Sequence, residues 1–282
     1  MRNCGVKSPE EFRSVITMIL GSKPIDYRGE GSRHQVIEGV YTSTEAPSEY
    51  KIPLHHELSC TKNPPRYISF YCEVEPLAET GQTILAKTES VNSAIASIPT
   101  LWEAFDGKTL RYISRHPCAG SLFCKINPTH KPWQEMFETN DPLEVERICK
   151  EEGFEYEWSS EWIEVRRLIP ALRQADEHFP FSYWFNQAHL YHPNPRMHGG
   201  YLKDFFVHLI YIDPSTRPYD IAFADGSEIP QEVIYEIYDI LDSQTIKFNW
   251  KEGDVLILDN FKMMHGRAPY KGKRRILAAL TQ

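Results

Sequence analysis

The alternation of apolar and polar positions predicts a chain built mainly of β-strands. Short runs rich in β-branched and aromatic residues recur between turn residues along the whole sequence. We expect strands at residues 35–41, 67–74, 82–86, 110–115, 162–169, 182–186, 245–249, 255–258 and 275–280. Between two of them, the segment WKEGD at 250–254 is typical of a glycine-containing turn of hairpin length.

Helical patterns are fewer and lie between the predicted strands. The first helix should have Ser8 as its N-cap, Pro9 at its first position and Gly21 just beyond its end, with apolar residues at helical spacing in between. Further helices are expected at 91–105 with a break at a proline, at 142–152 and at 230–242. The prolines, 20 in all, favour a sandwich or barrel. The prediction is therefore a mainly β fold, with a double-sheet core and flanking helices.

Length, composition and charge narrow the classes of function. The 282 residues contain no repeat or low-complexity linker, so a single domain over 1–282 is expected. The net charge of −8 disfavours nucleic acid and anionic membranes as partners. The polar N-terminus does not resemble a secretory signal, and no apolar run reaches the roughly 18 residues of a membrane span, which predicts a cytoplasmic protein. The 6 scattered cysteines are expected to be reduced thiols.

Several catalytic motifs are absent from the sequence. There is no GxGxxG, no GxxxxGK[ST] and no GxSxG. The string from His56 fails the zinc-protease pattern HExxH, because Cys60 stands where the second histidine belongs. The pair His189 and His192 has ligand-like spacing, but we interpret it as structural or hydrogen-bonding.

A possible metal site begins with His55 and Glu57. In an extended segment, residues two apart point to the same side, so one imidazole and one carboxylate can converge while His56 faces away. Non-haem iron oxygenases hold Fe(II) with two histidines and one carboxylate. Alone, the pair is more typical of solvent-exposed or hydrogen-bonded structural histidines than of a metal site. A second histidine, His265, ends a loop after a buried strand, and Arg275 opens the last strand, where its guanidinium could bind the far carboxylate of 2-oxoglutarate.

Four blocks in order carry a resemblance to a known family: YTSTEAPSEYKIPLHHELS, FYCEVEPLAETGQTILAKT, YWFNQAHLYH and WKEGDVLILDNFKMMHGRAPYKGKRRIL. The chain resembles the TauD/TfdA-like Fe(II)/2-oxoglutarate oxygenases, in particular their SyrP-like and clavaminate-synthase-like branch, over nearly its whole length. The resemblance implies a double-stranded β-helix, or jelly roll. Members usually begin with more chain before the first helix, so an edge strand is expected to be missing.

The resemblance also implies roles for individual residues. It makes His55, Glu57 and His265 the iron ligands. Arg275 would bind the distal carboxylate of 2-oxoglutarate, helped by the hydroxyl of Thr83. The family's GGxT pattern reads TGQT at 80–83 here, so its first glycine is missing. Further candidates near the cosubstrate are Arg267 and Arg274, in a C-terminal segment, 263–282, that contains basic residues and no acid. Candidate substrate contacts are Arg33, Asn186 and Gln187.

The activity implied is oxidation of an unactivated C–H bond with Fe(II), 2-oxoglutarate and O₂, giving succinate and CO₂. Hydroxylation of a small amino-acid-like substrate, free or carrier-bound, in natural-product biosynthesis is the expected outcome. Desaturation or ring closure are alternatives, whereas Glu57 argues against halogenation. Two other classes stay open: a cupin-like hydrolase or isomerase that does not use 2-oxoglutarate, and an interaction module that kept the fold without chemistry.

Overall fold

The computed structural model describes residues 1–2, 4–27, 29–31, 33–126, 130–200, 203, 205, 209, 211 and 213–282. These residues separate into two compact units. Unit 1 comprises Met1–Leu58, Asn63–Val91 and Leu241–Gln282, and unit 2 comprises Ser59–Lys62 and Asn92–Ile240. Most of unit 2 is thus one long insertion into the sequence of unit 1. No shift in composition marks the insertion, and the single domain predicted from the sequence stays a prediction.

Within the described part of the chain, no helix has the length and apolar character needed to cross a membrane.

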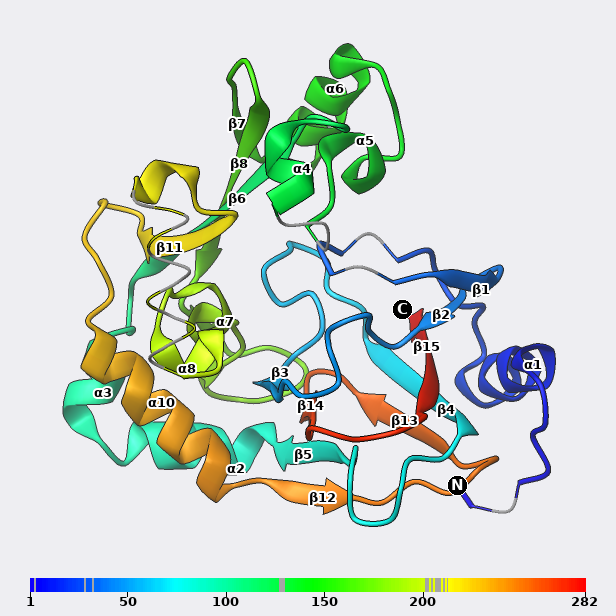
Figure 1. The fold of residues 1–282 in the computed structure, drawn as a ribbon. Coiled ribbons are helices and arrows are strands. Elements are labelled where there is room, and N and C mark those ends of the chain that lie inside the picture. Colours follow the sequence, from blue (N-terminus) through cyan, green and yellow to red (C-terminus); the bar gives the residue numbers. More distant parts are fainter. Residues whose placement is uncertain are drawn as a thin grey trace. The chain divides into compact units, whose positions relative to one another are not determined.

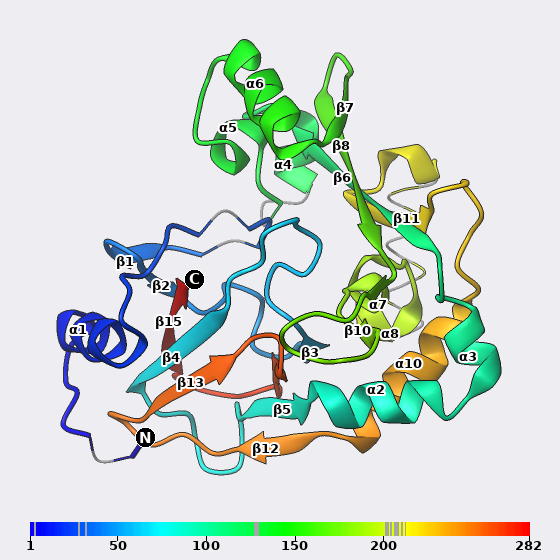
Figure 2. The same cartoon turned by 180° about the vertical axis from the view of Figure 1, so that it is seen from behind.

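Unit 1 contains two antiparallel sheets (Figures 1 and 2). Sheet A has the order β1 (Gln35–Ile37), β2 (Val40–Thr42), β15 (Arg275–Thr281), β4 (Tyr67–Val74) and β13 (Val255–Asp259). Sheet B has the order β12 (Ile246–Phe248), β5 (Thr83–Lys87), β14 (Met263–Arg267) and β3 (Ile52–His55). Strands from both ends of the chain are therefore neighbours in each sheet.

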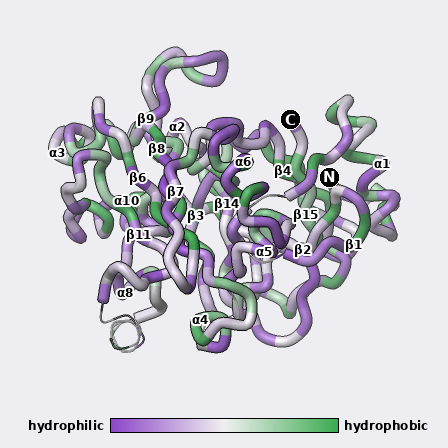
Figure 3. The backbone as a smooth tube through the Cα atoms, turned by 90° about the horizontal axis from the view of Figure 1, so that it is seen from above, coloured by the Kyte–Doolittle hydropathy of each residue, from purple (hydrophilic) through white to green (hydrophobic). Residues whose placement is uncertain are grey.

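Sheet A is covered by apolar side chains on both faces. Phe70 and Ile276 point to one face, where they share a core cluster with Leu85 of sheet B. Tyr71 and Leu277, one position further along each strand, point to the other face and pack against helix α1 (Pro9–Leu20). This alternation follows from the period of two in a strand. Figure 3 shows how hydrophobic and hydrophilic residues alternate along α1.

Unit 2 has an antiparallel sheet of its own with the order β11 (Tyr219–Phe223), β6 (Thr109–Pro117), β8 (Trp162–Pro170) and β7 (Glu155–Trp158), and a short ladder of β9 (Leu172–Arg173) and β10 (Tyr183–Trp184). A separate core cluster contains Trp133, Val145 and Ile163. The remaining helices are α2 (Thr88–Ala96), α3 (Pro99–Glu103), α4 (Leu122–Ile126), α5 (Trp133–Met136), α6 (Pro142–Glu152), α7 (Ala188–Tyr191), α8 (Pro195–His198), α10 (Gln231–Ser243) and the 3₁₀ turn η1 (Pro214–Thr216).

The mainly β prediction is confirmed, and so are the helix at 9–20 and its caps. The Ser8 side chain accepts a hydrogen bond from the Glu11 amide, and Gly21 ends the helix in the left-handed conformation, with φ of 72°. Two predictions were wrong in detail. Residues 35–41 form a hairpin rather than one strand, because the chain turns at Gly39 with φ of 74°. The turn at 250–254 joins two sheets, since β12 pairs with β5 and β13 pairs with β4.

The packing of α1 on sheet A yields a stability prediction. Phe12 is fully buried and its ring stacks on Tyr71 at 5.6 Å, so Phe12→Ala should lower the free energy of unfolding by about 3–5 kcal/mol. Met18, on the same helix, is 77% exposed, and Met18→Ala should change stability by less than about 0.5 kcal/mol. Urea unfolding of both variants measures the difference. Equal losses would show that α1 is not anchored through Phe12.

Candidate metal centre

The two histidines come together because their strands are neighbours. Strand β14 lies between β3 and β5, and His265 is directly opposite His55. Opposite residues of an antiparallel pair share a face of the sheet. Their ring centroids are accordingly 4.5 Å apart. The loop predicted at His265 was wrong: the residue lies in β14, which is too short and too mixed in composition to show a strand pattern.

Gly266 allows this close pairing of β14 with β3. A Cβ atom at this position would lie 2.4 Å from the carbonyl oxygen of Ile52 and 2.8 Å from that of Pro53. Real Cβ atoms do not approach backbone oxygens so closely, so any other residue would push the two strands apart. The glycine after the histidine is therefore part of how the two imidazoles are brought together.

Glu57 reaches the histidines from a turn and not from an extended strand. Strand β3 ends at His55, and Leu58 has a φ of 51°, in the left-handed region that non-glycine residues rarely adopt. The side chain of Asn260 holds this turn: Oδ1 accepts from the Glu57 amide at 2.7 Å, and Nδ2 donates to the Glu57 carbonyl at 2.9 Å. The side-chain amide of Asn260 thus bonds both backbone groups of Glu57, as a neighbouring strand would. No pattern in the sequence points to this role of Asn260.

The three side chains form a compact donor set. One ligand atom from each of His55, Glu57 and His265 lies within 4.8 Å of the others, and the described residues contain no other such group of three or more. His265 Nε2 is 3.3 Å from Glu57 Oε2. His55 Nδ1 lies 2.8 Å from the Pro53 carbonyl, and donating there leaves the lone pair on Nε2, as a metal requires. Two imidazoles and one carboxylate are the donors that suit Fe(II) in oxygenases.

Arg33 provides the charge partner of the Glu57 carboxylate. Its Nη2 atom lies 2.9 Å from Oε1 and 3.0 Å from Oε2, and its guanidinium lies over the ring of Tyr27. Burial alone would raise the pKa of the Glu57 carboxyl, but Arg33 and the two imidazoles outweigh it and hold that pKa well below its usual range. The structure therefore places Arg33, a candidate substrate contact, on the carboxylate of the candidate metal site.

A second charged side chain, Arg274, lies beside the residues that precede β5. Arg274 donates from Nε to the Gly81 carbonyl at 2.9 Å, and a Cβ at Gly81 would lie 3.0 Å from its Cδ. Burial and the nearby Arg267 lower the pKa of Arg274 to about 10. The Trp250 indole donates to the Thr83 hydroxyl oxygen at 2.9 Å, which leaves that hydroxyl its own proton to donate. A partly buried cation without a carboxylate partner in the described chain is suited to bind an anion.

The other two candidate arginines have different surroundings. Arg267 is buried and donates to the carbonyls of Ala46, Pro47 and Tyr50, so it holds the loop before β3. Arg275, which the resemblance assigned to 2-oxoglutarate, is half-exposed and pairs with Glu73 at 2.7 Å. A bulge between Arg275 and the next residue shifts the register of β15.

The candidate residues in unit 2 form hydrogen bonds with other residues of that unit. Asn186 is fully buried, donates to the Ala171 carbonyl at 2.6 Å and accepts from the Ala188 amide at 2.9 Å. The Gln187 amide donates to the Tyr112 hydroxyl at 2.9 Å. His192 lies 3.1 Å from the Ile229 carbonyl, in line with its structural interpretation.

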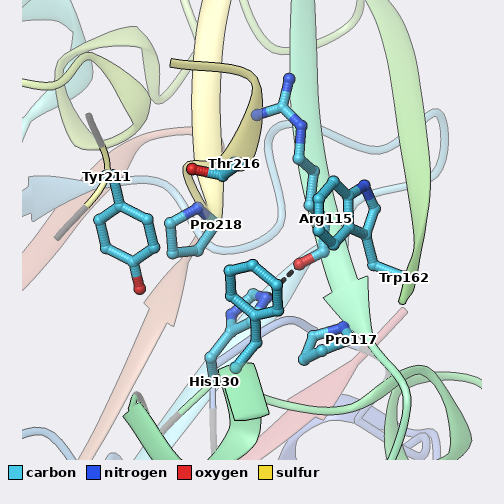
Figure 4. Close-up of a pocket in the computed structure, with 8 residues that line it drawn as sticks. Arg115, Pro117, His130, Trp162, Tyr211, Thr216 and Pro218 are labelled. Atoms are coloured by element: carbon cyan, nitrogen blue, oxygen red, sulfur yellow. Dashed lines mark hydrogen bonds between the residues drawn. The ribbon is translucent and has the colours of Figure 1, made fainter. Parts of the chain in front are cut away.

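Unit 2 also contains a small pocket of its own (Figure 4). Aromatic and proline side chains line most of it, among them Trp162 and Pro218. The polar groups in its wall are already paired: Arg115 binds Glu164 at 2.6 Å, and the His130 ring binds the Arg115 carbonyl. The pocket therefore presents mainly apolar surface, and its paired polar groups are not available to orient a polar ligand.

Comparisons with known proteins agree with this donor set. The chain matches the family model described as "Taurine catabolism dioxygenase TauD, TfdA family" over residues 1–281. It is 30% identical over 283 residues to the dapdiamide synthesis protein DdaC of Enterobacter agglomerans, covering 99% of this chain and 80% of that protein. It is 27% identical over 293 residues to a clavaminate synthase-like protein of Arabidopsis thaliana, covering 100% and 80%.

Among solved structures, the non-heme iron oxygenase OrfP with Fe, succinate and (3S)-hydroxy-L-Arg is 16% identical with a TM-score of 0.49, covering 100% of this chain and 69% of that one. Asparagine oxygenase is 11% identical with a TM-score of 0.48; the match covers 86% of this chain and 56% of that one. The family match confirms the predicted enzyme class, a non-haem iron dioxygenase, with iron and 2-oxoglutarate as its cofactors. The chain belongs to the TauD/TfdA family of dioxygenases.

Proposed function

We propose that this protein hydroxylates a C–H bond of a small amino-acid-like molecule, with Fe(II) held by His55, Glu57 and His265 and with 2-oxoglutarate converted to succinate and CO₂. The observation that carries the proposal is the convergence of two imidazoles and one carboxylate within 4.8 Å. The two facing sheets of unit 1, with their shared core, support a jelly roll as the fold around this site.

The protein's part in this reaction is to hold and orient the reactants. The bound iron would supply the oxidative chemistry. His55 and His265 keep their places through strand pairing, and Glu57 keeps its place through the Asn260 side chain. Because the protein would supply only three ligands, other positions on the ion would stay free for cosubstrate and oxygen.

For the cosubstrate, we assign the distal carboxylate of 2-oxoglutarate to Arg274 rather than Arg275. Arg274 is partly buried, donates to the carbonyl of Gly81, two residues before Thr83, and lies near Arg267, whereas Arg275 is half-exposed and already neutralised by Glu73. A planar guanidinium can bind a carboxylate through two donors, and the Thr83 hydroxyl can add a third. A cupin-like hydrolase without 2-oxoglutarate would leave this cationic group without a task.

For the substrate, the relative DdaC supports a role in natural-product biosynthesis, since its name places it in dapdiamide synthesis. We therefore propose an amino acid or amino-acid derivative, free or attached to a carrier. Formation of succinate with a panel of free amino acids and their derivatives would identify it. Outcomes other than hydroxylation, such as desaturation, would appear as a mass change in the product.

The metal assignment predicts a spectroscopic result. Fe(II) and 2-oxoglutarate added without oxygen should give the visible charge-transfer band of a chelated keto acid. Glu57→Ala removes the carboxylate ligand and should abolish succinate formation, with the variant's fold checked by circular dichroism. Glu155→Ala, which changes an exposed carboxylate of β7 about 100 residues from Glu57 in sequence, should retain the band. A folded, iron-loaded wild type without any band would contradict the proposed function.

The cosubstrate assignment predicts opposite results for adjacent arginines. Arg274→Gln should raise the KM for 2-oxoglutarate by about 10-fold or more, because a charge-assisted bidentate contact contributes about 1.5–3 kcal/mol. Arg275→Gln should leave this KM within about twofold, because Arg275 is paired with Glu73. Steady-state succinate assays measure both. The reverse order would restore the assignment to Arg275 that the resemblance implied.

A further inference from the structure

One side chain outside the donor set uses the same carboxylate as the metal would. Arg33 Nη2 is nearly equidistant from the two Glu57 oxygens, at 2.9 and 3.0 Å. Both side chains are buried, 9% and 5% exposed, so water screens their attraction only weakly. The Tyr27 ring lies 4.2 Å from the Arg33 guanidinium carbon and supports it from one face.

This position limits how a metal can use Glu57. A nitrogen equidistant from both oxygens occupies one lone pair on each of them, out of about four lone-pair sites on the carboxylate. Oε2, which lies 3.3 Å from His265 Nε2, is the oxygen turned toward the histidines. A metal must therefore bind Oε2 through its remaining lone pair or displace Nη2.

The charges of the site also oppose metal binding. With neutral imidazoles, the three proposed ligands carry one negative charge, and the Arg33 guanidinium cancels it. A divalent cation therefore enters an electrically neutral site rather than an anionic one, and a buried positive charge remains beside it. At such short range, inside a protein, this repulsion is strong.

We propose that Arg33 competes with the metal ion for the Glu57 carboxylate and thereby keeps the metal affinity below the value that the three ligands would give alone. The inference rests on the proposed function, because it takes His55, Glu57 and His265 as the metal ligands. It differs from a positioning role, which Asn260 fills: Asn260 fixes the Glu57 backbone from both sides, so the turn keeps its place without Arg33.

The test is the affinity for Co(II), measured by calorimetry on the full-length protein without 2-oxoglutarate. The neutral variants Arg33→Gln and Arg33→Met should bind Co(II) at least about tenfold more tightly than the wild type. Arg33→Met keeps the aliphatic stem that packs beside Tyr27, so it serves if the glutamine variant does not fold. Arg33→Lys keeps the charge and should stay within about threefold of the wild type.

Two further variants serve as references. Arg13→Gln removes the same charge from a surface pair with Glu38 and should leave the Co(II) affinity unchanged. Asn260→Ala should weaken it by about 10–100-fold, as expected when a group that orients a ligand is lost. A second readout is the rise in unfolding temperature caused by Co(II), which should be larger in the neutral Arg33 variants than in the wild type, because their Glu57 charge is otherwise uncompensated.

The results separate the two proposals. Folded neutral variants that bind Co(II) as weakly as the wild type, or more weakly, would overturn the competition and leave Arg33 a positioning residue. A wild type that binds no stoichiometric Co(II), or whose binding is unaffected by His265→Ala, would contradict the metal site itself and with it the proposed function.

Discussion

The buried carboxylate of Glu57 is the constraint on which the site depends. An ionised carboxylate inside a protein needs charged or hydrogen-bonding partners, because burial removes its hydration. Arg33 faces its oxygens, the imidazole of His265 lies beside Oε2, and Asn260 holds its backbone. These partners come from two stretches of the sequence, around Arg33 and around 260–265, both distant from Glu57. The sheets of unit 1 must be assembled before this charge can be buried at an acceptable energetic cost.

The convergence of His55, Glu57 and His265 could be predicted from the sequence, but the local structure that presents them could not. The spacing of His55 and Glu57 suggested convergence, and the three ligand atoms do converge. The reason was partly different, since Glu57 lies in a turn held by Asn260, a contact between residues 203 positions apart. No local pattern reveals such a contact. Strand β14 was missed for a similar reason, because pairing with two neighbours stabilises it and not its own composition.

The surroundings of the adjacent residues Arg274 and Arg275 could not be predicted from the sequence. In a regular strand, neighbouring residues point to opposite faces, so the register decides which of Arg274 and Arg275 faces inward. At the start of β15 the register against β4 skips one residue, because Arg275 is opposite Val74 and Ile276 is opposite Cys72. Arg275 pairs with Glu73, the skipped residue, and Arg274 is partly buried near Arg267. The dipeptide itself contains no trace of this bulge, whereas helix caps such as Ser8 and Gly21 are purely local and were predicted correctly.

The insertion of unit 2 into unit 1 has a consequence for how the protein is made. During synthesis, β3 and the residues after it leave the ribosome early, while β14 belongs to the last part of the chain. Closing so long a loop costs entropy that grows only slowly with length, so the insertion is tolerated, but it delays the long-range pairing. Strand β3 therefore waits as an unpaired edge while all of unit 2 is translated. Strands β4 and β5 wait for later partners as well, so all three are exposed to incorrect pairing in the nascent protein.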